Sequence, residues 1–293
     1  MKRNPVLLSI LLGCSLIATH ATAQTIKCSD VKIPVKGTLE VDAYAVNKAG
    51  VIAGDYVDSS GVQHGLILNK KTVTTFDPPA GGSTIAAYGI NNSNAAVGWY
   101  IDANGVTQGF VYANGQLASV FYPKSVGTQA DGINDNGWIV GSYVDTKGIT
   151  HGFYWDTVKY HKVDVKGAPS TTVWSINNAN TMAVFTLTSS GAGLDGYIYK
   201  SKKFTIMDVP GASESVLHGI NNNNDLDYTI FDSSSNRHGV LYQAATGVFT
   251  QFDDPNGANT TRADGINDSD EMVGRYSPSS GTPANVGFKC TVK

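Results

Sequence analysis

The residues best suited to bind a ligand or take part in a reaction lie where an otherwise regular repeat varies. An Ile-Asn or Val-Asn pair occurs six times, and the residue three places before each asparagine differs between copies, reading Tyr44, Tyr88, Asp131, Trp174, His218 and Asp264. Two places further back, the charged copies are Asp42 and Arg262. Aromatic faces beside hydrogen-bonding groups suit a sugar or another polar ligand. We therefore predict that these residues converge on one ligand-binding site.

The same residues lack the remaining parts of a catalytic mechanism. His218 with Asp131 or Asp264 is able in principle to transfer protons, but the sequence offers no nucleophile or metal motif to complete a reaction. Zinc requires three or four converging ligands. The other recurring histidines lie in alternate copies of the repeat, at His64, His151 and His238. We assign them structural roles, and we expect no catalytic residue, no metal and no cofactor.

Two sets of aspartates also recur with the repeat. One set opens polar turns, at Asp58, Asp102, Asp145 and Asp232. The other set stands shortly before Pro or Gly, at Asp77, Asp164, Asp208, Asp253 and Asp254. Calcium loops need several alternating acids, and a glycosidase needs one pair of carboxylates about 5 to 9 Å apart; the sequence brings neither together. We predict turn-forming roles for both sets.

The spacing of the asparagines indicates the architecture. They lie 43 to 46 residues apart, at Asn47, Asn91, Asn134, Asn177, Asn221 and Asn267, and this period is typical of propellers and related arrays. Turn pairs such as Asn104-Gly105 separate short apolar runs, which signals hairpins. We predict an all-β, six-bladed β-propeller of four-stranded antiparallel blades. The Ile-Asn strand is innermost, each asparagine bonds the turn it begins, and Gly89 and Gly132 allow close backbone approach near the axis.

The two ends of the chain complement each other. The last copy, from Asp264 to Lys293, lacks a fourth strand, and residues 24–37 match the fourth strand of the other copies. We expect this N-terminal strand to complete the last blade and close the ring, which leaves no edge strand unpaired. Cys28 and Cys290 then face each other, and we predict a disulfide between them. A closed ring needs no partner subunit, so we expect a monomer.

The N-terminus has the features of an export signal. Lys2 and Arg3 precede an apolar stretch, and Ala21-Thr22-Ala23 matches a small-x-small cleavage site. The sequence predicts a signal peptide over residues 1–23 and a single domain over residues 24–293, located in the periplasm or outside a bacterial cell. Residues 11–14 also resemble a lipobox, so a surface lipoprotein anchored through Cys14 is the alternative.

Composition and charge exclude several classes of function. The net charge of −3 becomes −5 when the two leader cations are removed, so no basic patch invites nucleic acid. Only 15% of residues are charged and 32 are glycine, as in chains of short strands and tight turns. After the leader, no apolar run approaches the roughly 20 residues that a membrane span needs.

Three motifs of the repeat resemble those of the HAF-type probable extracellular repeat family of bacteria. They are Gly-Ile-Asn, Val-Gly-x-Tyr as in residues 97–100, and the triplet His151-Gly152-Phe153, in which Gly replaces the Ala of the family's His-Ala-Phe. Half of the copies lack the histidine. The resemblance covers essentially all of the mature chain. It implies a bacterial extracellular repeat protein with propeller-like blades, and it brings no reaction or catalytic residue to carry over.

These features predict a secreted, non-catalytic binding propeller that holds a glycan or a peptide at the mouth of its axis. One alternative is an extracellular polysaccharide-degrading enzyme, a lyase or a hydrolase. Another is a structural or adhesive surface repeat protein that binds another protein. Exposure of Trp174, Tyr88 or Tyr44 would favour the glycan, a close carboxylate or His-Asp pair would favour the enzyme, and an exposed apolar patch would favour adhesion.

Overall fold

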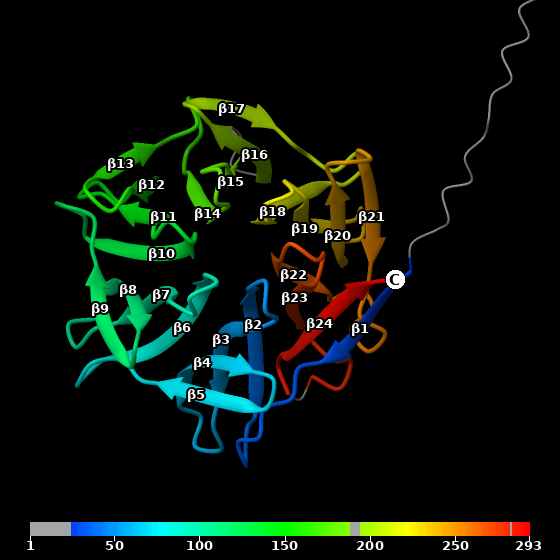
Figure 1. The fold of residues 1–293 in the computed structure, drawn as a ribbon, viewed down its shortest axis with the longest axis horizontal. Coiled ribbons are helices and arrows are strands. Elements are labelled where there is room, and N and C mark those ends of the chain that lie inside the picture. The colour runs from blue at the N-terminus through cyan, green and yellow to red at the C-terminus, as the bar shows by residue number, and fades with distance from the viewer. Residues whose placement is uncertain (1–24, 188–193, 282) are drawn as a thin grey trace, which may run out of the picture.

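Residues 25–187, 194–281 and 283–293 are described by the computed structural model. These residues form 24 strands in six four-stranded antiparallel sheets, arranged as blades around a central axis (Figure 1). The predicted six-bladed propeller is confirmed. The predicted signal peptide, residues 1–23, and Cys14 within it lie outside the described residues.

The first three blades each run from the innermost to the outermost strand along the chain. The first blade contains β2 (Glu40–Val46), β3 (Ile52–Val57), β4 (Gln63–Asn69) and β5 (Thr72–Phe76). The second contains β6 (Ser83–Ile90), β7 (Ala96–Ile101), β8 (Thr107–Ala113) and β9 (Gln116–Val120). The third contains β10 (Gly127–Ile133), β11 (Ile139–Val144), β12 (Thr150–Trp155) and β13 (Tyr160–Val163).

The other blades repeat this order, with one change in the last. The fourth blade contains β14 (Thr172–Ile176), β15 (Met182–Leu187), β16 (Leu194–Lys200) and β17 (Lys203–Ile206). The fifth contains β18 (Glu214–Ile220), β19 (Leu226–Phe231), β20 (Arg237–Gln243) and β21 (Val248–Phe252). The sixth contains β22 (Arg262–Ile266), β23 (Met272–Tyr276), β24 (Val286–Val292) and, as its outer strand, β1 (Ile26–Asp30).

The N-terminal strand closes the ring. β1 pairs with β24, so that Cys28 lies directly opposite Cys290, and Figure 1 shows the blue β1 beside the red β24. The two cysteines form a disulfide with their Cα atoms 4.0 Å apart, within the separation of about 7 Å that a bridge allows. The predicted closure and disulfide are confirmed.

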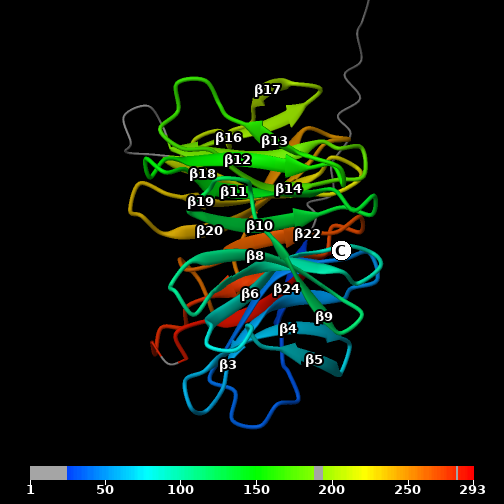
Figure 2. The same ribbon diagram turned by 90° about the vertical axis from the view of Figure 1, so that its left-hand side faces the viewer.

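Side chains between the blades form the core. Neighbouring blades pack face to face, as β8 and β10 do in Figure 2. Ala53, Ile85 and Phe110 belong to one such cluster, between the first and second blades. Because both faces of a blade are covered, consecutive residues of the second strand are buried, as in the first three positions of β7.

Antiparallel pairing gives the ring two different faces. In the first blade, Glu40 at the start of β2 lies opposite Val57 at the end of β3, which lies opposite Gln63 at the start of β4. This face, here called the proximal face, carries the turns between second and third strands and the connections between blades. The opposite face, here called the Asn face, carries the turns that the core asparagines begin.

The core asparagines join the blades to one another. Asn134 Oδ1 accepts hydrogen bonds from the backbone N–H groups of Asn136 and Trp138, each at 3.0 Å, which confirms the predicted turn role. Each asparagine Nδ2 also donates to the backbone carbonyl of the core asparagine in the next blade, at 3.0 to 3.3 Å. These bonds run in a closed circle through Asn47, Asn91, Asn134, Asn177, Asn221 and Asn267.

Small residues bring the inner strands close enough for this circle. A Cβ atom on Gly132 would lie 2.9 Å from the Cα atom of Ser175 in the next blade, and a Cβ on Gly89 would lie 2.9 Å from the Cα of Gly132. The predicted close approach is therefore confirmed. Among the described residues, no helix has the length and hydropathy of a membrane span.

Candidate functional site

A β-bulge in every inner strand positions the residue that breaks the repeat. In the third blade, Ala130 pairs with Gly141 and Gly132 pairs with Val140, so Asp131 is the extra, unpaired residue. The same register shift occurs in the other inner strands, at Tyr44, Tyr88, Trp174, His218 and Asp264. A bulge redirects a side chain out of the regular alternation, and the sequence showed only that these positions vary.

Five of the bulge residues line a chamber of ≈ 80 Å³ on the axis, namely Tyr44, Tyr88, Asp131, Trp174 and Asp264. Its floor is a ring of six aliphatic side chains, Val46 and the isoleucines of the Ile-Asn pairs, which also bounds a cavity on the Asn face. Asp131 is 1% exposed, Tyr44 5% and Trp174 9%; Tyr88 is partly exposed. Five of the eight predicted residues therefore converge on one small chamber on the axis.

The aromatic side chains of the chamber wall contact one another. The ring centroids of Tyr44 and Tyr88 are 4.3 Å apart, and those of Tyr88 and Trp174 are 5.4 Å apart. Trp174 continues the contact to His218 in the fifth blade at 4.9 Å. The rings of Tyr44, Tyr88, Trp174 and His218, from four blades, therefore form one connected chain of contacts.

Asp264 lies in a cluster with two arginines. Arg262 Nε donates to Asp264 Oδ1 at 2.7 Å, and Arg275 Nη1 lies 3.5 Å from Asp264 Oδ2. Burial would raise the pKa of Asp264, but the two positive charges outweigh it and hold that pKa below its usual value. Sequence reasoning missed Arg275, which lies on β23 opposite Arg262. Its signal was the cross-strand register of a predicted hairpin.

Three of the predicted residues, His218, Asp42 and Arg262, do not line the chamber. Burial, and next to it the charge of Arg262, lowers the pKa of His218 to about 3, so the imidazole is neutral at ordinary pH. Asp42 lies opposite Asp55 on β3, and burial raises the pKa of both carboxyl groups. Asp55 is only 2% exposed, so this close pair of carboxyl groups is not open to a polymeric substrate.

Asp131 differs from Asp264 in having no partner. Neither of its carboxyl oxygens makes a hydrogen bond, and both are buried. Burial raises its pKa well above the usual value. An unpaired buried carboxyl group is destabilising unless a proton, a cation or a hydrogen-bond donor compensates it. Asp131 is therefore the residue of the chamber wall that most lacks a binding partner.

Larger cavities lie between the blades on the proximal face. The cleft between the first and second blades has a volume of ≈ 600 Å³ and is bounded by Val62, His64, Asp77, Pro78 and neighbouring residues. The cleft between the second and third blades has a volume of ≈ 430 Å³, with Thr107, Val126 and Gln129 among its walls. A third, of ≈ 210 Å³, lies beside His151 and Asp164 at the connection to the fourth blade.

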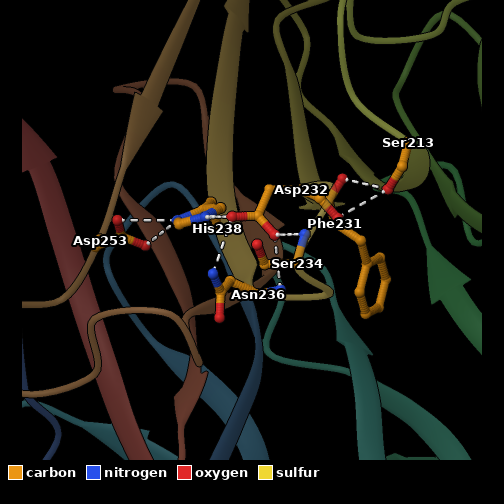
Figure 3. A network of polar contacts seen from close by, with 7 residues as sticks. All are labelled: Ser213, Phe231, Asp232, Ser234, Asn236, His238 and Asp253. Carbon is orange, nitrogen blue, oxygen red and sulfur yellow. Dashed lines mark hydrogen bonds and ion pairs between the residues drawn. The ribbon is translucent and has the colours of Figure 1, made fainter.

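An Asp-His-Asp arrangement recurs in alternate blades, and two of its histidines, His64 and His151, line clefts. His64 Nδ1 lies 2.6 Å from Asp77 Oδ1, and His64 Nε2 lies 3.4 Å from Asp58 Oδ2. His151 repeats this with Asp164 and Asp145. Figure 3 shows the version in the fifth blade, where His238 Nδ1 is 3.0 Å from Asp253 and Nε2 is 3.6 Å from Asp232.

The turn aspartates therefore have two tasks. Asp58 Oδ1 accepts hydrogen bonds from the N–H groups of Ser60 and Val62, which confirms the predicted turn role, while Oδ2 faces His64. The predicted turn role does not describe the side chains of Asp77, Asp164 and Asp253, because each of them contacts a histidine. The sequence signal was their shared spacing of 13 to 15 residues from that histidine. Among the described residues, no three His, Cys, Asp or Glu side chains are placed to hold a metal ion.

Comparisons with known proteins find the fold and no relatives in sequence. No protein-family model and no curated protein matches the chain. The SapL1 lectin in complex with alpha methyl fucoside is similar in structure, with a TM-score of 0.55, 8% identity, and coverage of 88% of this chain and 96% of that one. A variant of the Aleuria aurantia lectin in complex with Fucalpha1-6GlcNAc has a TM-score of 0.52, 9% identity, and coverage of 88% and 95%.

TolB from Acinetobacter baumannii is also similar, with a TM-score of 0.53, 11% identity, and coverage of 88% of this chain and 65% of that one. At such low identity these likenesses establish the propeller fold alone. Since a lectin and TolB share it, the choice of function depends on the surface of this chain.

Proposed function

We propose that the protein binds carbohydrate without catalysis, and that the sugar lies in the clefts between blades on the proximal face. The observation that carries this proposal is the size and repetition of the clefts. Volumes of ≈ 600 and ≈ 430 Å³ lie within the range of about 300 to 1,000 Å³ usual for small-molecule sites. The axial chamber, at ≈ 80 Å³, is smaller than that range.

Each cleft combines apolar surface with hydrogen-bonding groups. In the first cleft, Val62 is 50% exposed next to His64 and Asp77. In the second cleft, Val126 is 51% exposed near Gln129. A sugar ring presents C–H faces as well as hydroxyl groups and therefore needs both kinds of surface. Repeated clefts on one face also allow a branched or polymeric glycan to be held at several points, which raises the overall affinity.

The structurally similar lectins supply the first probe. Two of them are complexes with fucosides, and fucose carries a methyl group that is able to contact the exposed valine at each cleft. The comparison supports the choice of fucosides for a first experiment, while the cleft residues carry the argument.

We further propose that the chain is an exported bacterial protein of the HAF-type repeat family. The motifs of the inner and middle strands support the family. The Cys28–Cys290 disulfide supports export, since disulfides persist in oxidising compartments.

A glycan-array screen tests the proposal with two matched variants. The first carries Val62→Lys and Val126→Lys, which place a bulky cation in each large cleft at positions that are already half exposed. The control carries Val158→Lys, at an 84% exposed valine in the turn between β12 and β13 on the Asn face. All three proteins are compared at equal thermal stability.

We expect the parent and the Val158→Lys control to bind the same glycans and the double variant to lose them. Equal binding by the double variant would place the sugar outside the clefts. Absence of binding by the parent would contradict the carbohydrate assignment itself.

A further inference from the structure

Two aspartates occupy opposite bulges at the axis, and their surroundings differ. Asp264 on β22 and Asp131 on β10 come from blades on opposite sides of the ring (Figure 1). Both are almost fully buried and both line the axial chamber. Asp264 is paired with Arg262 and Arg275, whereas both oxygens of Asp131 lack a hydrogen-bond partner.

The third blade has neutral residues where the sixth blade has arginines. Gln129 and Ser142 form the cross-strand pair that corresponds to Arg262 and Arg275. The third blade therefore has the buried carboxyl group of the sixth blade without the two arginines that accompany it there. The ionised form of a carboxyl group so placed is stabilised by a cation or a hydrogen-bond donor from elsewhere; without one, burial favours the protonated form.

Other groups of the chamber lack partners too. Trp174 Nε1 and Ser175 Oγ are buried without a hydrogen bond, and both residues line the chamber together with Asp131. Ser175 Oγ is able to accept a hydrogen bond from an ammonium group, whereas the indole N–H of Trp174 only donates. Tyr44, Tyr88 and Trp174 contribute aromatic rings to its wall. Aromatic faces attract cations through their quadrupoles, and the attraction grows when the site is shielded from water.

We propose that the axial chamber binds a small monovalent organic cation of the primary-ammonium class, with Asp131 as its counter-ion and the rings of Tyr88 and Trp174 as walls. The volume of ≈ 80 Å³ holds two or three groups of water size, at about 30 Å³ each. A methylammonium group fits this space, and a whole sugar ring does not.

The donor set disfavours a divalent metal ion. Calcium takes about six to eight oxygen ligands, several of them carboxylates. The second carboxylate in the wall, Asp264, already has two arginine partners. Guanidinium groups already lie over the rings of Trp174 and Tyr44, at 5.9 and 4.8 Å from their centroids. The ring of Tyr88 and one unpaired carboxyl group match an ammonium ion instead of a divalent metal. Of the bulge residues that line the chamber, Tyr88 alone is partly exposed, so the cation enters beside it from the proximal face.

Methylammonium chloride is the probe for the test. Thermal melting and tryptophan fluorescence are recorded during its titration, because Trp174 lines the chamber. Sodium chloride at equal ionic strength controls for salt, and methanol is a neutral molecule of similar size. The variants are Asp131→Asn, which keeps the shape of the side chain, and Asp268→Asn as a control at a partly exposed carboxylate on the Asn face.

We expect saturable stabilisation of the parent and of Asp268→Asn by methylammonium, with no matching effect of sodium or methanol. In Asp131→Asn the dissociation constant should rise roughly ten- to a hundredfold, as for loss of a hydrogen bond to a charged group. A parent that responds equally to sodium or methanol, or does not respond, overturns the proposal whether or not the variant folds. An unchanged response in Asp131→Asn removes the role of this carboxylate.

Discussion

Breaking one link of the asparagine circle should destabilise the whole ring. The side chain of Asn134 makes four hydrogen bonds: its Oδ1 accepts from the N–H groups of Asn136 and Trp138, and its Nδ2 donates to Asn177 O and Asn180 Oδ1, all at 3.0 Å. Asn134→Ala removes all four bonds and leaves two backbone N–H groups without an acceptor. At about 1 to 3 kcal/mol for each unsatisfied group, we expect a loss of roughly 2 to 6 kcal/mol, a large part of the about 5 to 15 kcal/mol typical of domains.

Asn134→Asp distinguishes the contribution of the turn bonds from that of the asparagine circle. Aspartate keeps both acceptor bonds of the turn but loses the two donors, and its carboxylate then faces the oxygens of Asn177 and Asn180. We expect a loss of roughly 2 kcal/mol at neutral pH. Because this setting raises the carboxyl pKa in the folded state, the folded variant binds a proton more readily than the unfolded chain, and its deficit shrinks as the pH falls towards 4.

Urea denaturation at pH 7 and pH 4 measures these effects. The control is Asn114→Asp, an exposed residue with a φ of 52° in the turn between β8 and β9, which should stay within about 0.5 kcal/mol of the parent. If Asn134→Ala is no worse than the control, or the deficit of Asn134→Asp is the same at both pH values, the circle does not stabilise the ring as argued.

Two further predictions concern the Cys28–Cys290 disulfide and the buried His218. Replacing Cys28 and Cys290 by serine should lower the free energy of unfolding by up to about 5 kcal/mol, because the bridge closes a very long loop; an unchanged urea midpoint would contradict this. The pKa of His218, lowered to about 3, means that only the unfolded chain binds its proton between about pH 6.5 and pH 3. The parent should therefore lose about 1.4 kcal/mol per pH unit below 6.5 relative to His218→Gln, and parallel stability curves for the two proteins would refute it.

The sequence predicts the architecture because one structural unit is repeated six times along the chain. Asn134 and its copies mark the innermost strand, and the need for close approach at Gly132 follows from its place near the axis. Residues 24–37 match a fourth strand without the first three, and the last copy of the repeat has three strands without the fourth. Together they predict the ring closure. These features depend on local pattern, which a single sequence displays.

The candidate site was predicted less completely, because it depends on distances across the axis and between strands. The sequence identifies Tyr88 and Trp174 as variable, but not that their rings contact each other and line one chamber with Asp131. It shows His64 and Asp77 separately, whereas their contact requires the pairing of β4 with β5. Arg275 was overlooked because it occupies the variable third position of the Val-Gly-x-Tyr motif, where each of the other copies carries a different residue.

The most direct test of the central claim is a crystal structure of the protein with the glycan that the array selects. Our account predicts sugar density in the cleft beside Val62, His64 and Asp77, with a second copy beside Val126 where the glycan reaches it. Density only at another surface, with both clefts empty, would contradict it.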